Sequence, residues 1–257
     1  MGKYRKLKLT NQLLKDDMIY EYNGVKGFAG TLAERESEFG GSMLGDNKAH
    51  PDMLIRVLIA THRYALTDDE TFNIIVGQPI TNHTDAYKNK MKEMLLGEHV
   101  FTINNVTKKL TINRVEVAAE GASAYWSAPK KGKVRIIDAG SGTVNIATID
   151  NGMYIDKESD TLPFGLNTNI SNDLDAFARR VAIACLKKWN RNDEVYTVGG
   201  NASGLLVPLL YHFPNAKTLS PMLNDGSGKV KLLPPIYANA VAFYKIAEKV
   251  FQDVVQH

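Results

Sequence analysis

The sequence predicts an α/β protein. Short apolar runs rich in β-branched residues alternate with segments whose apolar residues recur at helical spacing. A polar stretch that carries Pro129 and Gly132 interrupts this pattern and is the clearest boundary in the chain. The 257 residues are enough for one large domain or two modest ones, each with a buried core. We therefore expect strands and helices in two parts that join near this boundary.

The residues before the boundary are expected to form two hairpins and several helices. Asn23-Gly24 suits the positive φ angles of a tight turn and predicts a hairpin between 18–22 and 25–29. Pro51 is typical of a first helical position and predicts a helix that starts there. The other expected elements are a loop or short helix over 31–50, a strand over 72–76, a helix over 85–96, a hairpin between 100–103 and 109–112, a strand over 115–117 and a small-residue helix over 118–126.

The residues after the boundary start with a third hairpin. Its strands are the β-branched runs 136–139 and 144–150, joined by a turn with two glycines. Asn172 or Asp173 is expected to cap a long helix that runs to Trp189. The other expected elements are a short strand at 153–154, a strand over 194–198, a helix over 203–211, a short strand over 218–220 and a helix over 237–255 after Pro234-Pro235.

The composition excludes several classes of protein. A net charge of +3 is small for this length, so no surface for direct nucleic-acid binding is expected. No apolar run reaches membrane-spanning length and no signal peptide follows Met1, which predicts a cytoplasmic protein with no membrane partner. The single cysteine, Cys185, lies in an apolar helical run and is expected in the core. The histidines have no metal-ligand spacing and are expected to be structural or to lie at the surface.

The turn of the third hairpin is the strongest candidate for a functional site. One carboxylate, two glycines and two hydroxyls are more than a turn requires; they belong to Asp138, Gly140, Ser141, Gly142 and Thr143. Glycines at a hairpin tip let backbone N–H groups approach a phosphate, and a carboxylate at the strand end can orient a metal ion or a water. The alternative is a plain glycine hairpin. The pattern favours the binding of nucleotide phosphates.

Two further candidates are weaker on their own. Gly199-Gly200-Asn201 stands between a strand and a helix, where glycines let the backbone approach a flat ligand. Tight packing of the strand on the helix explains such a pair equally well. Glu120 is a lone carboxylate among small residues that could hold an attacking water. An exposed glutamate at a helix start is the equally good alternative.

In their order along the chain, these motifs resemble the actin-like ATPase superfamily. The Asp138 hairpin, the long helix and the glycine junction are followed by a segment with Ala238-Asn239-Ala240 and Phe243-Tyr244-Lys245. Within the superfamily, the stretches 28–33, 72–79 and 243–245 resemble the plasmid-segregation actins of ParM type. The resemblance implies a ribonuclease-H-like fold of two domains with a nucleotide cleft between them. One domain would comprise 1–129 with 237–257, and the other 130–236.

The resemblance also implies roles for the candidate residues. Asp138 would be catalytic and would hold Mg²⁺ and its waters, and Glu120 would position the hydrolytic water. The terminal phosphates of ATP or GTP would lie against Gly140, Ser141, Gly142 and Thr143. Gly199, Gly200 and Asn201 would form the adenosine motif, and Asn239 and Ala240 would lie in a helix about which the domains pivot.

Two departures from the family pattern carry expectations of their own. The family opens with a first phosphate hairpin, and no such segment precedes Met18, so we expect a truncated start or an impaired ATPase. Only one helix fits between Leu166 and Asp193. The subdomain that many actins insert there is therefore expected to be absent, as in the reduced AlfA-like segregation actins.

The function implied by the resemblance is that of a filament-forming nucleotidase. Copies would stack head to tail with ATP or GTP and Mg²⁺, and the filament would segregate plasmid or phage DNA through a DNA-binding adaptor protein. Two alternatives stay open. One is a small-molecule kinase of the same superfamily, and the other is a truncated, non-catalytic variant that binds or caps filaments.

Overall fold

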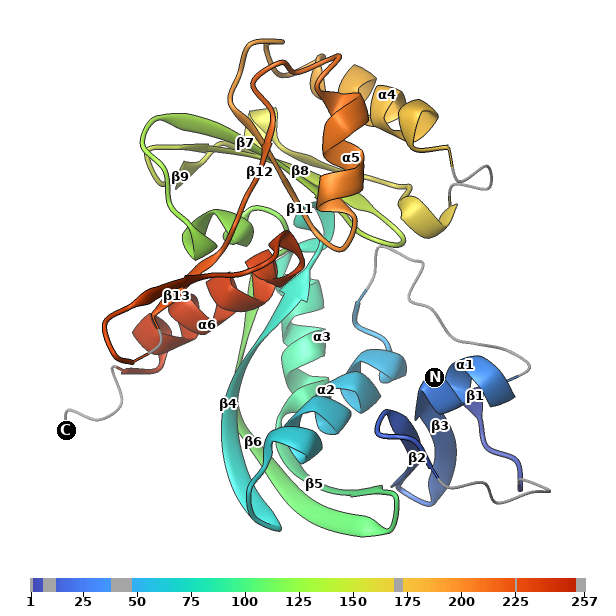
Figure 1. Ribbon diagram of the computed structural model, residues 1–257. Coiled ribbons are helices and arrows are strands. Elements are labelled where there is room, and N and C mark those ends of the chain that lie inside the picture. Colours follow the sequence, from blue (N-terminus) through green and yellow to red (C-terminus); the bar gives the residue numbers. More distant parts are fainter. Residues whose placement is uncertain (1, 7–12, 38–47, 169–172, 225, 253–257) are drawn as a thin grey trace. The chain divides into compact units, whose positions relative to one another are not determined.

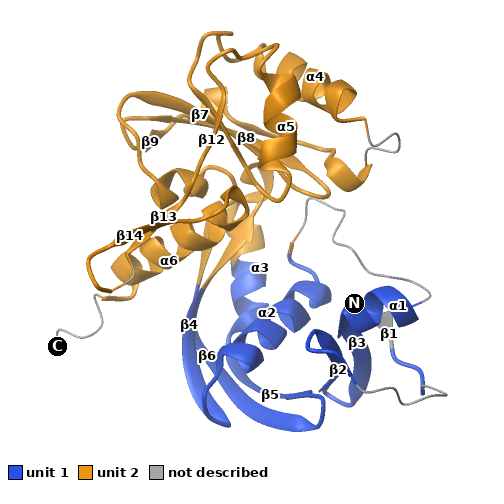
Figure 2. Ribbon diagram, in the orientation of Figure 1, with its two compact units in different colours: residues 1–43, 49–74, 89–115 blue, residues 44–48, 75–88, 116–257 orange. Residues whose placement is uncertain are grey.

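The computed structural model describes residues 2–6, 13–37, 48–168, 173–224 and 226–252 (Figure 1). The chain divides into two compact units, each built from several segments (Figure 2). Unit 1 comprises Met1–Met43, Ala49–Ile74 and Asn89–Val115, and unit 2 comprises Leu44–Lys48, Ile75–Lys88 and Glu116–His257. The predicted domain bounds, 1–129 with 237–257 and 130–236, stay a prediction.

Unit 1 is built on a six-stranded sheet, from which β4 and β6 continue into unit 2. The strands, in spatial order, are β1 (Gly2–Lys3), β3 (Val25–Gly30), β2 (Asp17–Tyr22), β5 (Gly97–Ile103), β6 (Val106–Ala119) and β4 (Asp69–Gln78). Both predicted hairpins are confirmed. Asn23-Gly24 has φ angles of 48° and 76°, and Asn104-Asn105 has 48° and 66°, as asparagine and glycine at hairpin turns allow.

Three α-helices lie between the strands of this sheet in the sequence. They are α1 (Thr31–Glu36), α2 (Pro51–Tyr64) and α3 (Asp85–Leu95). Pro51 occupies the first helical position of α2, as predicted, and the His50 ring accepts a hydrogen bond from the Asp52 amide. Leu58 of α2 and Met91 and Leu95 of α3 are fully buried, so both helices turn apolar faces inwards.

Unit 2 has a mixed sheet at its centre. Its strands, in spatial order, are β10 (Asp160–Leu162), β8 (Val144–Asp150), β7 (Lys133–Ala139), β11 (Val195–Val198) and β12 (Lys217–Thr218), with β9 (Met153–Tyr154) beside β8. β7 and β8 are antiparallel, whereas β11 runs parallel to β7 and to β12. Both faces are covered, because Ile137 packs in one core with α4 (Leu174–Cys185) and α5 (Ala202–Leu209), while Ile136 packs in another with Tyr125 and Ala238. Burial on both faces explains why the neighbouring positions Ile136 and Ile137 of β7 are both apolar.

The predicted helix over 118–126 is wrong. β6 continues to Ala119, and the backbone N–H of Glu120 still donates to the Gln78 carbonyl at the end of β4, 2.8 Å away. Gly121 then breaks the strand with a φ of 75°, and only a 3₁₀ helix, η2 (Ser123–Ser127), follows. Pairing with a strand distant in sequence outweighs the helical propensity of the small residues. Glu120 therefore stands at a strand end and not at a helix start.

The remaining helices differ from the prediction mainly at their ends. α4 is capped by Asp173, as predicted, but ends at Cys185, after which Trp189 closes a turn through its N–H to the Cys185 carbonyl. The last helix, α6, spans Ala238–Val250, and residues 253–255 of the predicted helix lie outside the described residues. In the described part of 166–193, α4 is the only α-helix, beside the short 3₁₀ helix η4 (Leu166–Thr168).

Several smaller elements complete the fold. A two-stranded hairpin of β13 (Met222–Asn224) and β14 (Val230–Leu232), which the sequence did not predict, precedes α6. The other 3₁₀ helices are η1 (Ile80–Asn82), η3 (Asp156–Glu158) and η5 (Pro235–Tyr237). Cys185 is fully buried, as predicted for a core residue. None of the described helices is long and apolar enough to cross a membrane.

Candidate functional site

Asp138 lies near the carboxyl end of β7, in the middle of the unit 2 sheet. Its neighbours in register are Asn145 on β8 and Val198 on β11. The residue is only 6% exposed. A carboxylate at this depth is costly to ionise unless charges or hydrogen bonds compensate for the lost water.

The compensation of Asp138 is incomplete. Asn239 of α6 donates a hydrogen bond from Nδ2 to Asp138 Oδ2 at 2.8 Å, which favours the charged form. Burial disfavours it, and so does the like charge of Glu120. These two effects outweigh Asn239 and the positive charge of Lys48, and they raise the pKa of Asp138 to about 6. A carboxyl group held in this state is typical of functional sites.

Glu120 approaches the same place from the end of β6. An added Cβ on Gly77 would lie 2.7 Å from Glu120 Cγ, so the glutamate side chain runs directly over the Gly77 backbone. The Glu120 carboxylate is 3.5 Å from Lys48 Nζ, and its side chain is 21% exposed. The neighbouring amide of Gly121 donates to Asn239 Oδ1 at 3.1 Å. Asn239 thus ties the end of β6 to Asp138, and the structure brings the two predicted catalytic carboxylates together.

The turn after Asp138 is fixed by hydrogen bonds to its carbonyl groups. Gly140 N–H donates to the Thr143 carbonyl, which closes the tip. The carbonyls of Gly140 and Ser141 each accept a hydrogen bond at 2.9 Å, from the amides of Leu166 and Asn167. In the part of the chain that the structure describes, the amides of Ser141 and Gly142 have no protein acceptor. Backbone N–H groups fixed in this way can bind an anion.

Gly199 packs against the same strand end. Its φ is 99°, and an added Cβ would lie 2.9 Å from the Ala139 carbonyl oxygen and 3.2 Å from Asp138 Oδ1. A side chain therefore has no room there. Gly200 is exposed, and Asn201 is the N-cap residue of α5, although its side chain makes no capping hydrogen bond. The structure thus places Gly199 against Asp138. Gly200 and Asn201 connect it to the start of α5.

The Asp138 carboxylate suits a hard metal ion that takes only one or two ligands from the protein and the others from water and a bound phosphate. The described residues contain no group of three or more His, Cys, Asp or Glu side chains that could hold a metal. Mg²⁺ is commonly held by one or two carboxylates, with waters and substrate phosphates completing its shell. Asp138, beside amides that have no protein acceptor in the described part of the chain, fits such an ion together with a phosphate ligand.

Two residues near the two carboxylates, Lys48 and Gln78, have no motif that could have revealed them. Lys48 lies in the polar stretch 31–50, for which a loop or short helix is predicted, and Gln78 follows the strand predicted over 72–76. Asn145 carries a signal in hindsight, because it stands opposite Asp138 in the predicted hairpin; its Oδ1 accepts from Thr161 Oγ1 at 2.7 Å. Asn239 was expected only as part of a pivoting helix, and its bond to Asp138 adds a second role.

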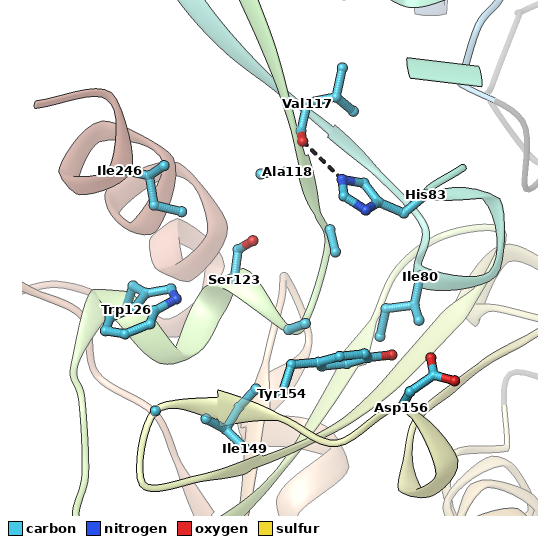
Figure 3. Close-up of a pocket in the computed structure, with 13 residues that line it drawn as sticks. Ile80, His83, Val117, Ala118, Ser123, Trp126, Ile149, Tyr154, Asp156 and Ile246 are labelled. Atoms are coloured by element: carbon cyan, nitrogen blue, oxygen red, sulfur yellow. Dashed lines mark hydrogen bonds between the residues drawn. The ribbon is translucent and has the colours of Figure 1, made fainter. Parts of the chain in front are cut away.

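Unit 2 also has an apolar groove, with a volume of about 480 Å³, that is separate from the carboxylates (Figure 3). In this groove, His83 Nε2 is 2.8 Å from the Val117 carbonyl oxygen. This contact makes it structural, as predicted. The groove is lined by Ile80, His83, Val117, Ala118, Ala119, Ala122, Ser123, Trp126, Ile149, Gly152, Tyr154, Asp156 and Ile246.

Comparison with known proteins identifies similar sequences and folds. Residues 1–122 match a family model described as the N-terminal domain of actin-like proteins. Comparison by sequence with curated proteins gave no match. An AlfA filament bound to AMPPNP is similar over 98% of this chain and 87% of that one, with 22% identity and a TM-score of 0.73. An AlfA filament from a B. subtilis plasmid, pLS32, is similar over 95% and 86%, also with 22% identity and a TM-score of 0.73.

Two crystal structures extend the likeness. The apo ParM protein of pSK41 is similar over 100% of this chain and 90% of that one, with 16% identity and a TM-score of 0.72. Ta0583, an archaeal actin homologue in complex with ADP, is similar over 90% and 89%, with 16% identity and a TM-score of 0.68. These likenesses confirm the fold class expected from the sequence.

Proposed function

We propose that this chain is a bacterial actin-like protein, which binds a nucleoside triphosphate with Mg²⁺ at Asp138 and assembles into filaments that segregate plasmid DNA. The family-model match over residues 1–122 and the likeness to AlfA and ParM structures support this. The observation that carries this proposal is the incompletely compensated Asp138 carboxylate beside the unpartnered amides of Ser141 and Gly142. The Asp138 carboxylate can bind a metal ion, and the backbone N–H groups can donate hydrogen bonds to an anion. A phosphate chain with a bound metal ion makes both interactions at once.

Each group of residues has a separate part in this proposal. The amides at the tip of the hairpin, with Thr143, bind the terminal phosphates, and Gly199, Gly200 and Asn201 form the wall beside the nucleoside. Asp138 holds the metal ion, and Asn239 orients the Asp138 carboxylate. Glu120 positions the water that attacks the terminal phosphate. Mg²⁺, when bound, screens the charge of the phosphates.

Self-association is supported by structural neighbours that are filaments, among them those of AlfA and Alp12. A head-to-tail contact that does not close into a ring produces an open polymer. Hydrolysis then destabilises the polymer if its contacts favour the triphosphate form. A net charge of +3 gives this chain little attraction for DNA, so a separate DNA-binding adaptor links filament and plasmid. Plasmid DNA lies in the cytoplasm, which is where this activity belongs.

Light scattering after nucleotide addition tests the proposal. We expect wild-type protein to scatter more light with ATP or GTP and Mg²⁺, and EDTA to abolish the increase. Asp138→Ala should show no increase. Asp150→Ala removes a carboxylate from the other end of the same hairpin and should behave as wild type.

Three results would contradict parts of the proposal. Normal assembly of Asp138→Ala would show that the site is assigned wrongly. Phosphate transfer to a sugar or carboxylate without assembly would identify a small-molecule kinase. Binding to preformed filaments with no nucleotide requirement would identify a capping protein.

A further inference from the structure

Lys48 places a positive charge beside the two carboxylates. Its ammonium nitrogen is 3.5 Å from Glu120 Oε1, which is a loose ion pair. The Lys48 side chain is 26% exposed, so the ammonium is neither buried nor fully hydrated. Lys48, Glu120 and Asp138 all belong to unit 2. Their arrangement is therefore set within one compact unit.

Gln78 fixes both members of this ion pair. Its backbone carbonyl accepts the Glu120 amide at 2.8 Å, and its side-chain Oε1 accepts the Lys48 amide at 3.2 Å. Gln78 is fully buried, and its Nε2 has no hydrogen-bond partner among the described residues. An unsatisfied buried donor destabilises a fold by about 1–3 kcal/mol, so such a group in a folded protein calls for a reason. Holding Lys48 and Glu120 in register is such a reason.

The charge balance of the site indicates what Lys48 binds. Asp138 and Glu120 are both acidic, and the phosphate chain of a nucleotide adds further negative charge. Among the described residues, Lys48 is the only cationic side chain that forms an ion pair with either carboxylate. At 3.5 Å its bond to Glu120 is long, and an ammonium has three donors, so it can bind a phosphate oxygen in addition.

We propose that Lys48 contacts the terminal phosphate of the bound nucleoside triphosphate and that Gln78 positions it there. This inference rests on the proposed function, since it assigns a further residue to the same site. A cation at the terminal phosphate favours the triphosphate over the diphosphate, because only the triphosphate presents that group. Lys48 thereby makes the site selective for the form that drives assembly.

Isothermal titration with AMPPNP and with ADP, both with Mg²⁺, tests this inference. Lys48→Met should weaken AMPPNP binding about 10- to 100-fold, as for a lost hydrogen bond between charged groups, and change ADP binding less than about threefold. Lys131→Met is the matched control: it removes an exposed lysine from the turn before β7 and should change neither affinity.

The role of Gln78 has a separate readout. Gln78→Leu keeps the approximate volume and loses the bond to the Lys48 amide, so it should lower the preference for AMPPNP over ADP. In the Lys48→Met background the same change should have no further effect on that preference, because residues that act as a unit are not additive. A merely structural role for Gln78 would lower both affinities alike in either background.

The outcomes separate the two proposals. If wild-type protein binds AMPPNP and Lys48→Met binds it equally well, or loses AMPPNP and ADP binding to the same extent, the inference about Lys48 is wrong and the proposed function stands. If folded wild-type protein binds neither nucleotide, both are wrong. Thermal melting of each variant checks that it is folded.

Discussion

One strand of unit 2 carries two buried charged residues, of which one is paired with opposite charges and the other is not. Arg135 and Asp138 both lie on β7 and are 2% and 6% exposed. The guanidinium of Arg135 donates to Asp193 Oδ2 at 2.7 Å, to Thr148 Oγ1 at 2.5 Å and to Glu158. It also lies 5.4 Å from the centre of the Trp189 ring. This cation is therefore paired with two carboxylates and packed against an aromatic ring.

Asp138, three residues further along β7, has an amide partner and a like charge nearby. Burial and Glu120 raise its pKa to about 6, whereas the hydrogen bond and charge of Arg135 lower the pKa of Glu158. The comparison teaches that burial alone does not mark a functional charge. A fully paired group such as Arg135 holds strands together, and an incompletely paired group such as Asp138 is available to a ligand.

The largest effect is expected at Arg135. Arg135→Met removes the partner of two carboxylates and should lower the free energy of unfolding by about 3 kcal/mol, the lower end of the range for breaking a buried pair, because Asp193 and Glu158 are each partly exposed. Urea unfolding followed by tryptophan fluorescence measures this. Arg179→Met, on the exposed side of α4, should change stability by less than about 0.5 kcal/mol. If Arg135→Met and Arg179→Met are equally stable, Arg135 does not stabilise the fold and the contrast with Asp138 is wrong.

Asp138→Asn should raise the free energy of unfolding, whereas Arg135→Met lowers it. The folded pKa of Asp138, about 6, lies above the ordinary value of 3.8, so ionised Asp138 destabilises the fold at neutral and higher pH. The variant should therefore be more stable than wild type by about 1–3 kcal/mol at pH 8. The gain should shrink as the pH falls through 6 and vanish near pH 4. Urea unfolding at a series of pH values gives this profile, and a variant that is less stable at pH 8 would contradict it.

The smallest effect on stability is expected at the glycine junction. Gly199→Ala places a Cβ 2.9 Å from the Ala139 carbonyl at a φ of 99° and should destabilise the fold by about 1–2 kcal/mol. Gly200→Ala meets its nearest atom, Ile236 Cδ1, at 3.7 Å and should be nearly neutral. Nucleotide titration of Gly199→Ala sharpens the comparison, because Gly199 packs against the Asp138 end of β7 and this variant should bind nucleotide more weakly than wild type. Wild-type affinity in Gly199→Ala would exclude Gly199 from the site.

The sequence predicts those parts of the molecule that local chemistry decides. Asn23-Gly24 and Pro51 fix a turn and a helix start within a few residues, and both predictions are confirmed. The helix over 118–126 failed because β6 pairs with β4, and nothing in a single short segment reports a partner strand some forty residues away.

The same reasoning applies to the candidate site. Asp138 and its glycines form one short motif, so they could be found together. Lys48 and Gln78 are 30 residues apart and meet only through the fold. The Arg135 network joins β7 to residues beyond β8 and α4, and no pattern in the sequence indicated it.

The most direct test of the central claim is a structure of the protein with AMPPNP and Mg²⁺. We expect the terminal phosphates to lie within hydrogen-bond distance of the amides of Ser141 and Gly142, with the metal bound to Asp138 directly or through a water. A nucleotide bound elsewhere, with the tip of the Asp138 hairpin free, would contradict the account.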